Sequence, residues 1–395
     1  MGIYLNPGNV EFQKIINGEY IDKTGIIALI NSTIGTTRKL FCISRPRAFG
    51  KSVTANMLCA YYDCSCDSHK LFDGKEIASS DKYLKHLNSY NVISLDITKF
   101  ISKVKSNGVS LETVTNEIVK AVHDDIKVAF PEYATGDSLN EDLIHFAEGT
   151  GRKFVFIIDE WDALIREAKG KRNIYSNYLN LLRSWFKNNN FTSRVVAAAY
   201  MTGILPIKKD DSQSAISNFT ENSILAPDKF AGYVGFTEKD VKNLCNKYDM
   251  SYEEVKKWYG GYIFNQTEEI YNPYSVMCAM KNMKMGLYWG RASETENLLR
   301  YMNFDFDGLQ EIIARLISGE KIEVETDSFE NDFESFRSRD DVLTLLIHLG
   351  YLTWDDETKM AHIPNEEVYD EFKIMMKRQK SIAAIVGDYS ELDRA

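Results

Sequence analysis

A basic loop that joins a short apolar run to a helix-favouring stretch constrains the fold of this chain most. Residues 39–44 (Lys-Leu-Phe-Cys-Ile-Ser) form the apolar run and predict a buried strand. Residues 45–50 (Arg-Pro-Arg-Ala-Phe-Gly) follow as the loop. Beyond it, residues 51–62 place apolar side chains at helical spacing: Val53, Met57, Leu58 and Tyr61. The pattern predicts a strand–loop–helix unit, the building block of an α/β sheet.

The end of this loop matches a phosphate-binding pattern in part. Gly50, Lys51 and Ser52 supply the last three positions of G-x-x-x-x-G-K-[ST], but Arg45 stands where the pattern has its first glycine. A loop between a strand and a helix can turn its N–H groups to one centre, and the helix N-terminus adds partial positive charge. A basic loop that merely caps a helix is the alternative.

The residue types in the loop suggest separate roles around a nucleotide. Gly50 lets the backbone pass close to the phosphates, Lys51 would pair with the β- and γ-phosphates, and the Ser52 hydroxyl would ligate Mg²⁺. Arg45 and Arg47 add two cations, either to contact phosphate or to pin the loop to a carboxylate. The expected nucleotide-binding residues are Arg45, Pro46, Arg47, Ala48, Phe49, Gly50, Lys51, Ser52 and Val53.

A second element is an apolar strand that ends in two acids. Residues 153–158 (Lys-Phe-Val-Phe-Ile-Ile) lead directly into Asp159 and Glu160, about 110 residues after the loop. Buried charge is costly unless it is compensated, so these carboxylates favour a site. Asp159 would hold Mg²⁺ through water, and Glu160 would polarise the attacking water. The alternative is a helix N-cap, which would not explain the pairing with the loop.

Two further strand ends carry polar residues. Residues 194–201 predict a strand that ends at Thr202, which could sense the γ-phosphate or could simply be a turn residue. Residues 91–96 predict another strand, and its last residue, Asp96, could serve in a turn or at the edge of a metal site. The predicted catalytic residues are therefore Glu160, Lys51 and Thr202, and the predicted metal ligands are Ser52 and Asp159.

Strands and helices alternate over the first 230 residues or so. Helices are predicted at 111–130 and 175–187, and a fifth strand at 222–226. This order predicts a parallel sheet with helices on both faces, which binds ligands at the carboxyl ends of its strands. We expect an α/β domain over 1–235.

The pattern changes after residue 235. Thr237 followed by Asp240 predicts a capped helix start, and 236–320 should form a mostly helical lid domain. Residues 321–340 are acidic and predict a linker. A winged-helix-like unit is expected over 341–395, in the order helix (341–349), hairpin (351–354 with 359–363), helix (365–377).

Composition narrows the class of protein. The 395 residues are 44% hydrophobic and 26% charged, as in globular proteins, and the net charge of −10 should repel nucleic acid and acidic membranes. We find no signal peptide and no apolar run long enough to span a membrane, and we expect the six cysteines to be free thiols in the cytoplasm. The sequence has no motifs of a protein kinase.

These residues resemble the bacterial AAA-ATPase-like family of predicted P-loop ATPases, over roughly residues 10–375. The loop Ser44-Arg-Pro-Arg-Ala-Phe-Gly-Lys-Ser52 carries the likeness most specifically, although the family usually has a second Arg at Ala48 and more often Tyr at Trp161. Further matches are Tyr20–Thr24, Leu71–Gly74, Ile158–Asp162, Thr202–Leu205, Tyr233–Thr237, Trp258–Tyr262 and Ile270–Ser275.

The resemblance implies an AAA+-like sheet of the type with an additional strand and a catalytic glutamate, in which the acidic strand is displaced from the loop strand. It also implies that Arg45 in place of glycine is the family's own loop form, and that 258–262 belongs to the lid beside the nucleotide. The family usually carries a C-terminal PD-(D/E)XK nuclease-like domain. We find no matching Asp…Glu-x-Lys constellation after residue 340 and expect that domain to be absent.

Two functions of different class follow from the sequence. The first is a Mg²⁺-dependent ATPase that acts as a molecular switch; ATP is favoured over GTP only by the resemblance. The second is a nucleotide-dependent module that contacts DNA or a protein partner with little or no turnover. DNA contact would involve the basic end of the last helix, which carries Lys373, Lys377, Arg378 and Lys380. The alternative is that these side chains are simply solvated at the end of a helix. A second copy of the chain, in a homo-oligomer, is a further partner that the sequence allows.

Overall fold

The computed structural model describes residues 2–168, 171–207, 216–264, 268–291, 308–330 and 336–378. The chain divides into two compact units. Unit 1 comprises Met1–Ser44 and Lys51–Asn222, and unit 2 comprises Arg45–Gly50 and Ser223–Ala395. Within the described ranges, no helix is long and apolar enough to cross a membrane.

Unit 1 is built on a five-stranded sheet in the order β2-β3-β4-β1-β5, and every pair is parallel. The strands are β1 (Leu40–Ser44), β2 (Asn91–Asp96), β3 (Phe154–Asp159), β4 (Val196–Gly203) and β5 (Thr220–Asn222). The parallel α/β fold is confirmed, and the acidic strand β3 is separated from the loop strand β1 by β4, as expected. The fifth strand lies at 220–222, earlier than the predicted 222–226.

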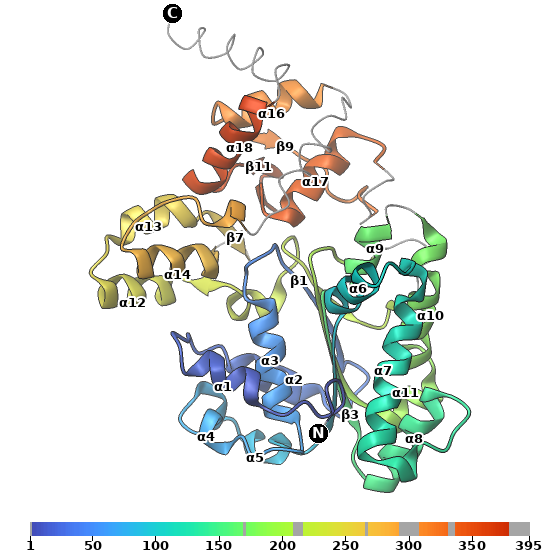
Figure 1. Cartoon of the computed structure of the whole chain (residues 1–395). Coiled ribbons are helices and arrows are strands. Elements are labelled where there is room, and N and C mark those ends of the chain that lie inside the picture. The colour runs from blue at the N-terminus through green and yellow to red at the C-terminus, as the bar shows by residue number, and fades with distance from the viewer. Residues whose placement is uncertain are drawn as a thin grey trace, which may run out of the picture. The chain divides into compact units, whose positions relative to one another are not determined.

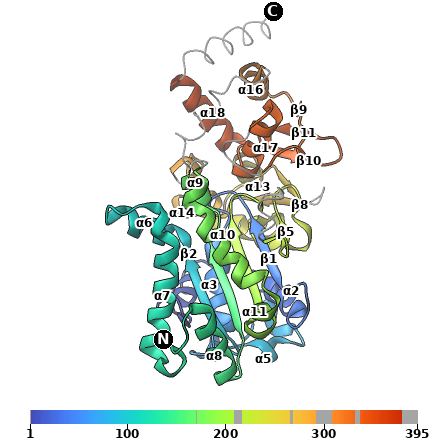
Figure 2. The same ribbon diagram turned by 90° about the vertical axis from the view of Figure 1, so that its right-hand side faces the viewer.

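Helices cover both faces of this sheet (Figures 1 and 2). One face carries α1 (Val10–Ile16), α2 (Gly25–Thr33) and α3 (Lys51–Tyr62). The other carries α7 (Val114–Ala129), α8 (Leu139–Thr150), α10 (Arg172–Phe186) and α11 (Asn189–Val195). Unit 1 also contains α4 (His69–Phe72), α5 (Tyr83–His86), α6 (Ile97–Ser106) and α9 (Ala163–Ala168).

Burial explains why these segments adopt this arrangement. All six residues of β3 are buried, as a strand covered on both faces requires. Phe156 of β3 packs against Trp185 and Phe186 of α10, with ring centroids 5.3 and 5.4 Å apart. Helix α7 buries one side only, through Val114, Ile118, Val122 and Ile126 at four-residue spacing. The amphipathic pattern of the sequence is therefore confirmed.

The first part of unit 2 contains helices and a small sheet. The helices are α12 (Glu238–Tyr248), α13 (Tyr252–Tyr259) and α14 (Pro273–Asn282). The predicted cap is confirmed, because Thr237 and Asp240 form a complete capping box at the start of α12. The expectation of a mostly helical region missed an antiparallel sheet in the order β6-β8-β7: β6 (Phe236–Thr237), β7 (Tyr262–Phe264) and β8 (Glu268–Tyr271).

The second part of unit 2 contains the predicted order of helix, hairpin and helix. The elements are α16 (Leu309–Ile317), β9 (Ile322–Glu323), α17 (Arg339–Leu349), β10 (Thr353–Asp355), β11 (Met360–His362) and α18 (Glu366–Arg378). The hairpin pairs β10 with β11, and β9 adds a third strand to β11. The acidic segment predicted as a linker over 321–340 therefore contributes a strand. Residues 379–395 of the predicted C-terminal unit lie outside the described residues.

Candidate functional site

Asp159 lies at the carboxyl end of β3 and is buried, with 8% of its surface exposed. The Thr202 hydroxyl donates a hydrogen bond to Asp159 Oδ1 over 2.5 Å, and the Ser52 hydroxyl is a second hydrogen-bond partner. Burial raises the pKa of the Asp159 carboxyl, and these two hydrogen bonds oppose that rise. Three of the predicted site residues thus meet at one carboxylate.

Glu160 follows in a left-handed backbone conformation, with φ of 52°. Its Oε1 lies 3.4 Å from Lys51 Nζ, and its Oε2 accepts a hydrogen bond from Arg166. The Lys51 side chain is only 4% exposed and that of Glu160 18%. A buried ammonium needs a nearby anion to offset its lost hydration, and Glu160 supplies it here.

Arg166 and Asp162 complete this cluster, although the sequence analysis gave neither a role in the site. Arg166 Nε lies 3.0 Å from Asp162 Oδ2. The buried Asp162 also accepts hydrogen bonds from the backbone N–H groups of Ile204 and Leu205 at 3.2 and 3.0 Å. The signal in the sequence was the spacing, because Asp162 and Arg166 stand one helical turn apart just after Glu160.

Thr202 lies near the end of β4, between the acidic strand and the loop strand. Its carbonyl oxygen accepts a hydrogen bond from the Trp161 N–H at 2.8 Å, so both its backbone and its hydroxyl face the acidic strand end. β4 pairs with both β1 and β3, so Thr202 stands at the carboxyl end of the strand between them. Sensing of a γ-phosphate by this residue stays a prediction.

Asp96 has a local structural role. In the strand register it stands beside Asp159, but its side chain caps α6. Oδ1 accepts hydrogen bonds from the Thr98 N–H at 3.0 Å and the Thr98 hydroxyl at 2.5 Å. The turn interpretation therefore describes Asp96 better than a metal ligand.

The loop 45–50 contains two residues with positive φ: Ala48 at 67° and Gly50 at 89°. Alternation of this kind points successive N–H groups into one concavity, the arrangement that binds anions. Arg45 is fully buried, and its guanidinium carbon lies 4.9 Å above the ring of Phe264. Phe49, also buried, meets Tyr262 edge to face at 5.2 Å. Both contacts lie within unit 2.

Ser52 at the start of α3 and Asp159 at the end of β3 are residues of the kind that coordinate Mg²⁺. Mg²⁺ takes one or two protein oxygens and keeps substrate phosphates and waters as its other ligands. Ser52 and Asp159 present such oxygens as hydrogen-bonded neighbours. Among the described residues, no group of three or more His, Cys, Asp or Glu side chains could hold a metal by itself. A metal here would therefore depend on the phosphates that it accompanies.

Val53, the last predicted nucleotide contact, is 38% exposed in the first turn of α3.

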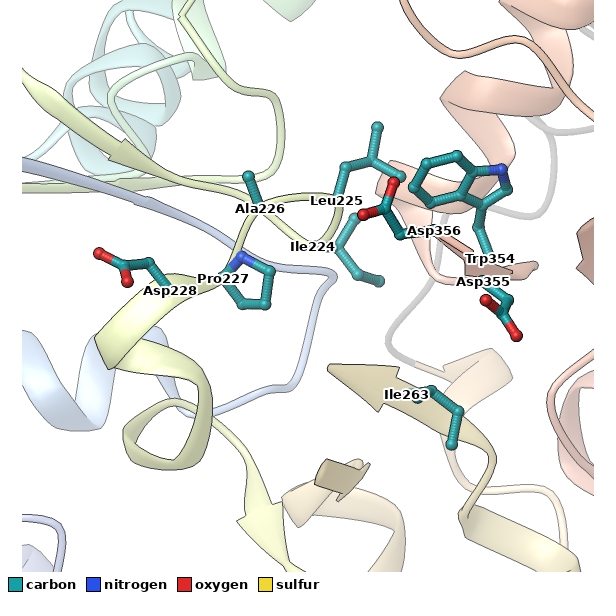
Figure 3. Close-up of a pocket in the computed structure, with 9 residues that line it drawn as sticks. All are labelled: Ile224, Leu225, Ala226, Pro227, Asp228, Ile263, Trp354, Asp355 and Asp356. Carbon is teal, nitrogen blue, oxygen red and sulfur yellow. The ribbon is translucent and has the colours of Figure 1, made fainter. Parts of the chain in front are cut away.

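Unit 2 also contains a separate cavity of about 450 Å³ (Figure 3). Its wall combines apolar side chains with three acids: Ile224, Leu225, Ala226, Pro227, Asp228, Ile263, Trp354, Asp355 and Asp356. Asp355 accepts hydrogen bonds from the N–H groups of its own hairpin turn, and Asp356 pairs with Lys359 at 2.7 Å. A cavity lined by carboxylates repels phosphate, so it is a poor candidate for the nucleotide.

Comparison with known proteins decides the family. The family described as Predicted AAA-ATPase matches residues 7–212, which is more than half of the chain. The chain belongs to the Predicted AAA-ATPase family. The matched range contains the loop, Lys51, Ser52, the acidic strand end and Thr202. The resemblance of the sequence to this family is confirmed, and with it the P-loop α/β fold. No curated protein matches the chain.

Solved structures of low sequence identity also match this chain. A Walker-type ATPase of Pyrococcus abyssi is 13% identical, covers 89% of this chain and 96% of its own, and has a TM-score of 0.46. The ORC2 protein of Aeropyrum pernix, solved as ADPNP and ADP complexes, is 10% identical, with 92% and 97% coverage and a TM-score of 0.36. The Cdc6p protein of Pyrobaculum aerophilum is 11% identical, with 86% and 88% coverage and a TM-score of 0.29.

Proposed function

We propose that this protein binds ATP with Mg²⁺ through residues 45–53 and hydrolyses it with Glu160 as the general base. The observation that carries the proposal is the meeting of Lys51, Ser52, Asp159, Glu160 and Thr202 at the carboxyl ends of β3 and β4 and the start of α3. A lysine for the phosphates, a hydroxyl and a carboxylate for Mg²⁺, and a residue that positions the attacking water recur in enzymes that hydrolyse nucleoside triphosphates.

Each side chain has one task in this proposal. Lys51 would neutralise the β- and γ-phosphates, and Ser52 and Asp159 would hold Mg²⁺. The metal, when bound, neutralises charge that develops on the phosphates. Glu160 orients and deprotonates the attacking water, and Thr202 both holds Asp159 and contacts the γ-phosphate. The N–H groups of 48–50 face the phosphates.

The contact between Lys51 and Glu160 suggests how the site responds to nucleotide. The Lys51 ammonium lies 3.4 Å from the carboxylate that would act as base. A polyphosphate is a stronger partner for Lys51 than one carboxylate, so ATP should draw the lysine away and release Glu160 Oε1 for water. This exchange makes the protein a molecular switch, in which the occupancy of the site changes the state of its base.

Two substitutions test the proposal. Lys51→Ala should abolish binding of Mg²⁺-ATP, measured by calorimetry. Glu160→Gln should keep binding and reduce hydrolysis by at least about 100-fold, the usual contribution of a general base. Hydrolysis at the wild-type rate by both variants would exclude this site as the catalytic centre.

A binding role with little turnover is the second possibility. DNA contact by the end of α18 gains no specific support, because Lys373 lies 3.6 Å from Asp370 and 4.0 Å above the ring of Tyr369. The side chains of Lys377 and Arg378, and all of Lys380, lie outside the described residues. Measuring hydrolysis with and without DNA, at low and moderate salt, separates the two possibilities, because DNA binding depends steeply on salt.

A further inference from the structure

Trp289 contacts the backbone of the phosphate loop. It begins a short 3-10 helix, Trp289–Arg291, and is almost completely buried, at 1% exposure. Its indole N–H donates a hydrogen bond to the carbonyl oxygen of Arg47 at 3.3 Å. The two residues are 242 positions apart in the sequence and belong to the same compact unit.

Trp289 is itself held by a buried carboxylate of α18. Glu367 Oε1 accepts hydrogen bonds from the backbone N–H groups of Tyr288 at 2.7 Å and Trp289 at 2.8 Å, and Glu367 is 2% exposed. The next turn of α18 places Glu371 against Gly290 so closely that a side chain there would collide with it. Glu367 and Glu371 both belong to α18, so side chains of this one helix hold the backbone of residues 288–290 in place.

A second set of contacts supports the loop next to Trp289. The ring of Trp289 packs on Tyr351 with centroids 4.8 Å apart. A Cβ atom on Gly350 would lie 2.8 Å from Cβ of Pro46, so the loop packs directly on that glycine. The Tyr262 hydroxyl donates to the Gly350 carbonyl at 2.8 Å, and the same ring meets Phe49.

We propose that Trp289 is a positioning residue for nucleotide binding: its indole holds the Arg47 carbonyl away from the phosphates, and Glu367 holds Trp289 in place. A carbonyl oxygen turned toward a phosphate would repel it, whereas a concavity of N–H groups attracts it. Holding the loop in its binding conformation removes an ordering cost from binding. The inference rests on the proposed nucleotide site and extends it to residues of the C-terminal half.

The chain provides a matched control for this hydrogen bond. Trp354, in β10, also donates its indole N–H to a backbone carbonyl over 3.3 Å, but its acceptor is Val324, the residue that follows β9, and not a residue of the loop. Trp289→Phe and Trp354→Phe therefore each remove one hydrogen bond from an indole N–H to a backbone carbonyl, and each keeps an aromatic ring. Only the first should weaken Mg²⁺-ATP binding, by about fivefold, which is the effect of one net hydrogen bond.

Glu367 provides the conservative rescue. Glu367→Gln keeps an oxygen that can accept both N–H groups, whereas Glu367→Leu removes it. We expect Glu367→Gln to bind Mg²⁺-ATP within twofold of wild type and Glu367→Leu to lose at least fivefold. The hydrolysis rate at saturating ATP should change less than the KM, because Trp289 and Glu367 are proposed to act through the phosphate loop and not on the groups that carry out the chemistry. Binding stoichiometry from calorimetry and urea unfolding measure how much of each variant is folded.

The outcomes are distinct. Weaker binding by Trp289→Phe and Glu367→Leu, at full stoichiometry and with Trp354→Phe and Glu367→Gln unchanged, supports the inference. Equal affinity of Trp289→Phe and wild type overturns it while leaving the nucleotide site intact. A loss shared equally by Trp354→Phe overturns it as well, because the effect is then one of general stability. Absence of binding by the wild type refutes the proposed function itself.

Discussion

Arg166 donates a hydrogen bond to the Oε2 atom of Glu160. The other oxygen of that carboxylate lies 3.4 Å from Lys51 Nζ, so two cations share one acid. In the proposed cycle Lys51 moves to the phosphates. Arg166 also forms an ion pair with Asp162 at 3.0 Å, so we expect it to stay bound to Glu160. Arg166 is then the residue that orients the base during hydrolysis.

Arg166→Ala should lower the hydrolysis rate at saturating ATP by at least about tenfold and change ATP affinity by less than twofold. The physical reason is that a misoriented base costs transition-state stabilisation but not ground-state binding. Steady-state kinetics together with calorimetry measure the two quantities. In a Glu160→Gln background the same substitution should have no further effect, and additive losses would contradict the assignment.

Thr202→Val should destabilise the fold by about 1–3 kcal/mol, because it leaves the buried Asp159 carboxylate without its 2.5 Å hydrogen bond. The valine side chain matches threonine in shape, so packing should change little. Urea unfolding measures the loss. Thr202→Ser retains the hydroxyl and should recover most of the stability, whereas a Thr202→Val variant as stable as wild type would show that the hydrogen bond does not stabilise the fold.

Gly50→Ala should weaken Mg²⁺-ATP binding by at least tenfold. Gly50 has φ of 89° with open space around its missing Cβ, so alanine there adds backbone strain and a methyl group beside the expected phosphates. Gly151, which ends α8 with φ of 65° and open space, provides the control. Both variants should lose about 1 kcal/mol of stability, and only Gly50→Ala should lose affinity. Equal affinities would argue against phosphate contact at Gly50.

The buried Glu367 predicts a pH dependence of stability. Burial raises its pKa from the usual 4.5 to about 7, and the neighbouring Glu371 adds to the rise. The folded protein therefore holds a proton that the unfolded chain releases, and this contribution is fully present below pH 4.5 and lost as pH rises through 7. The free energy of unfolding should fall by about 1.4 kcal/mol per pH unit in that window.

The Glu367→Gln variant has no titratable side chain at this position. Comparing it with wild type therefore separates the effect of Glu367 from that of other groups. The difference in unfolding free energy between wild type and variant, measured in urea from pH 5 to 8, should change with the predicted slope below pH 7 and level off above it. A difference that stays constant over this range would mean that the Glu367 pKa is not raised.

Much of unit 1 could be predicted from local patterns. Parallel strands present their carboxyl ends at one edge, so Asp159 and Thr202 could be placed near each other from strand boundaries alone, and β4 does lie between β1 and β3. Arg166 could not be assigned in the same way. Its partner depends on which side of the six-residue helix α9 faces Glu160, and so short a segment carries too little periodicity to show this.

Unit 2 was harder to predict for a related reason. Strands β6 and β9 have two residues each and β7 has three, which is too short for alternation to appear in the sequence. The contact between Arg47 and Trp289 joins positions that no local pattern connects. Non-local contacts of this kind are set by tertiary packing, so the sequence pointed to a nucleotide loop without showing what supports it.

The assignment of residues 45–50 to the packing of unit 2 has a consequence for biosynthesis. A ribosome releases the N-terminal half first, and domains generally fold as they emerge. The sheet of unit 1 can therefore form while Trp289, Gly350 and Glu367 are still being translated. In the proposed function, a nascent chain should capture ATP only after these three residues have left the ribosome, so that nucleotide occupancy would mark chains in which unit 2 has formed.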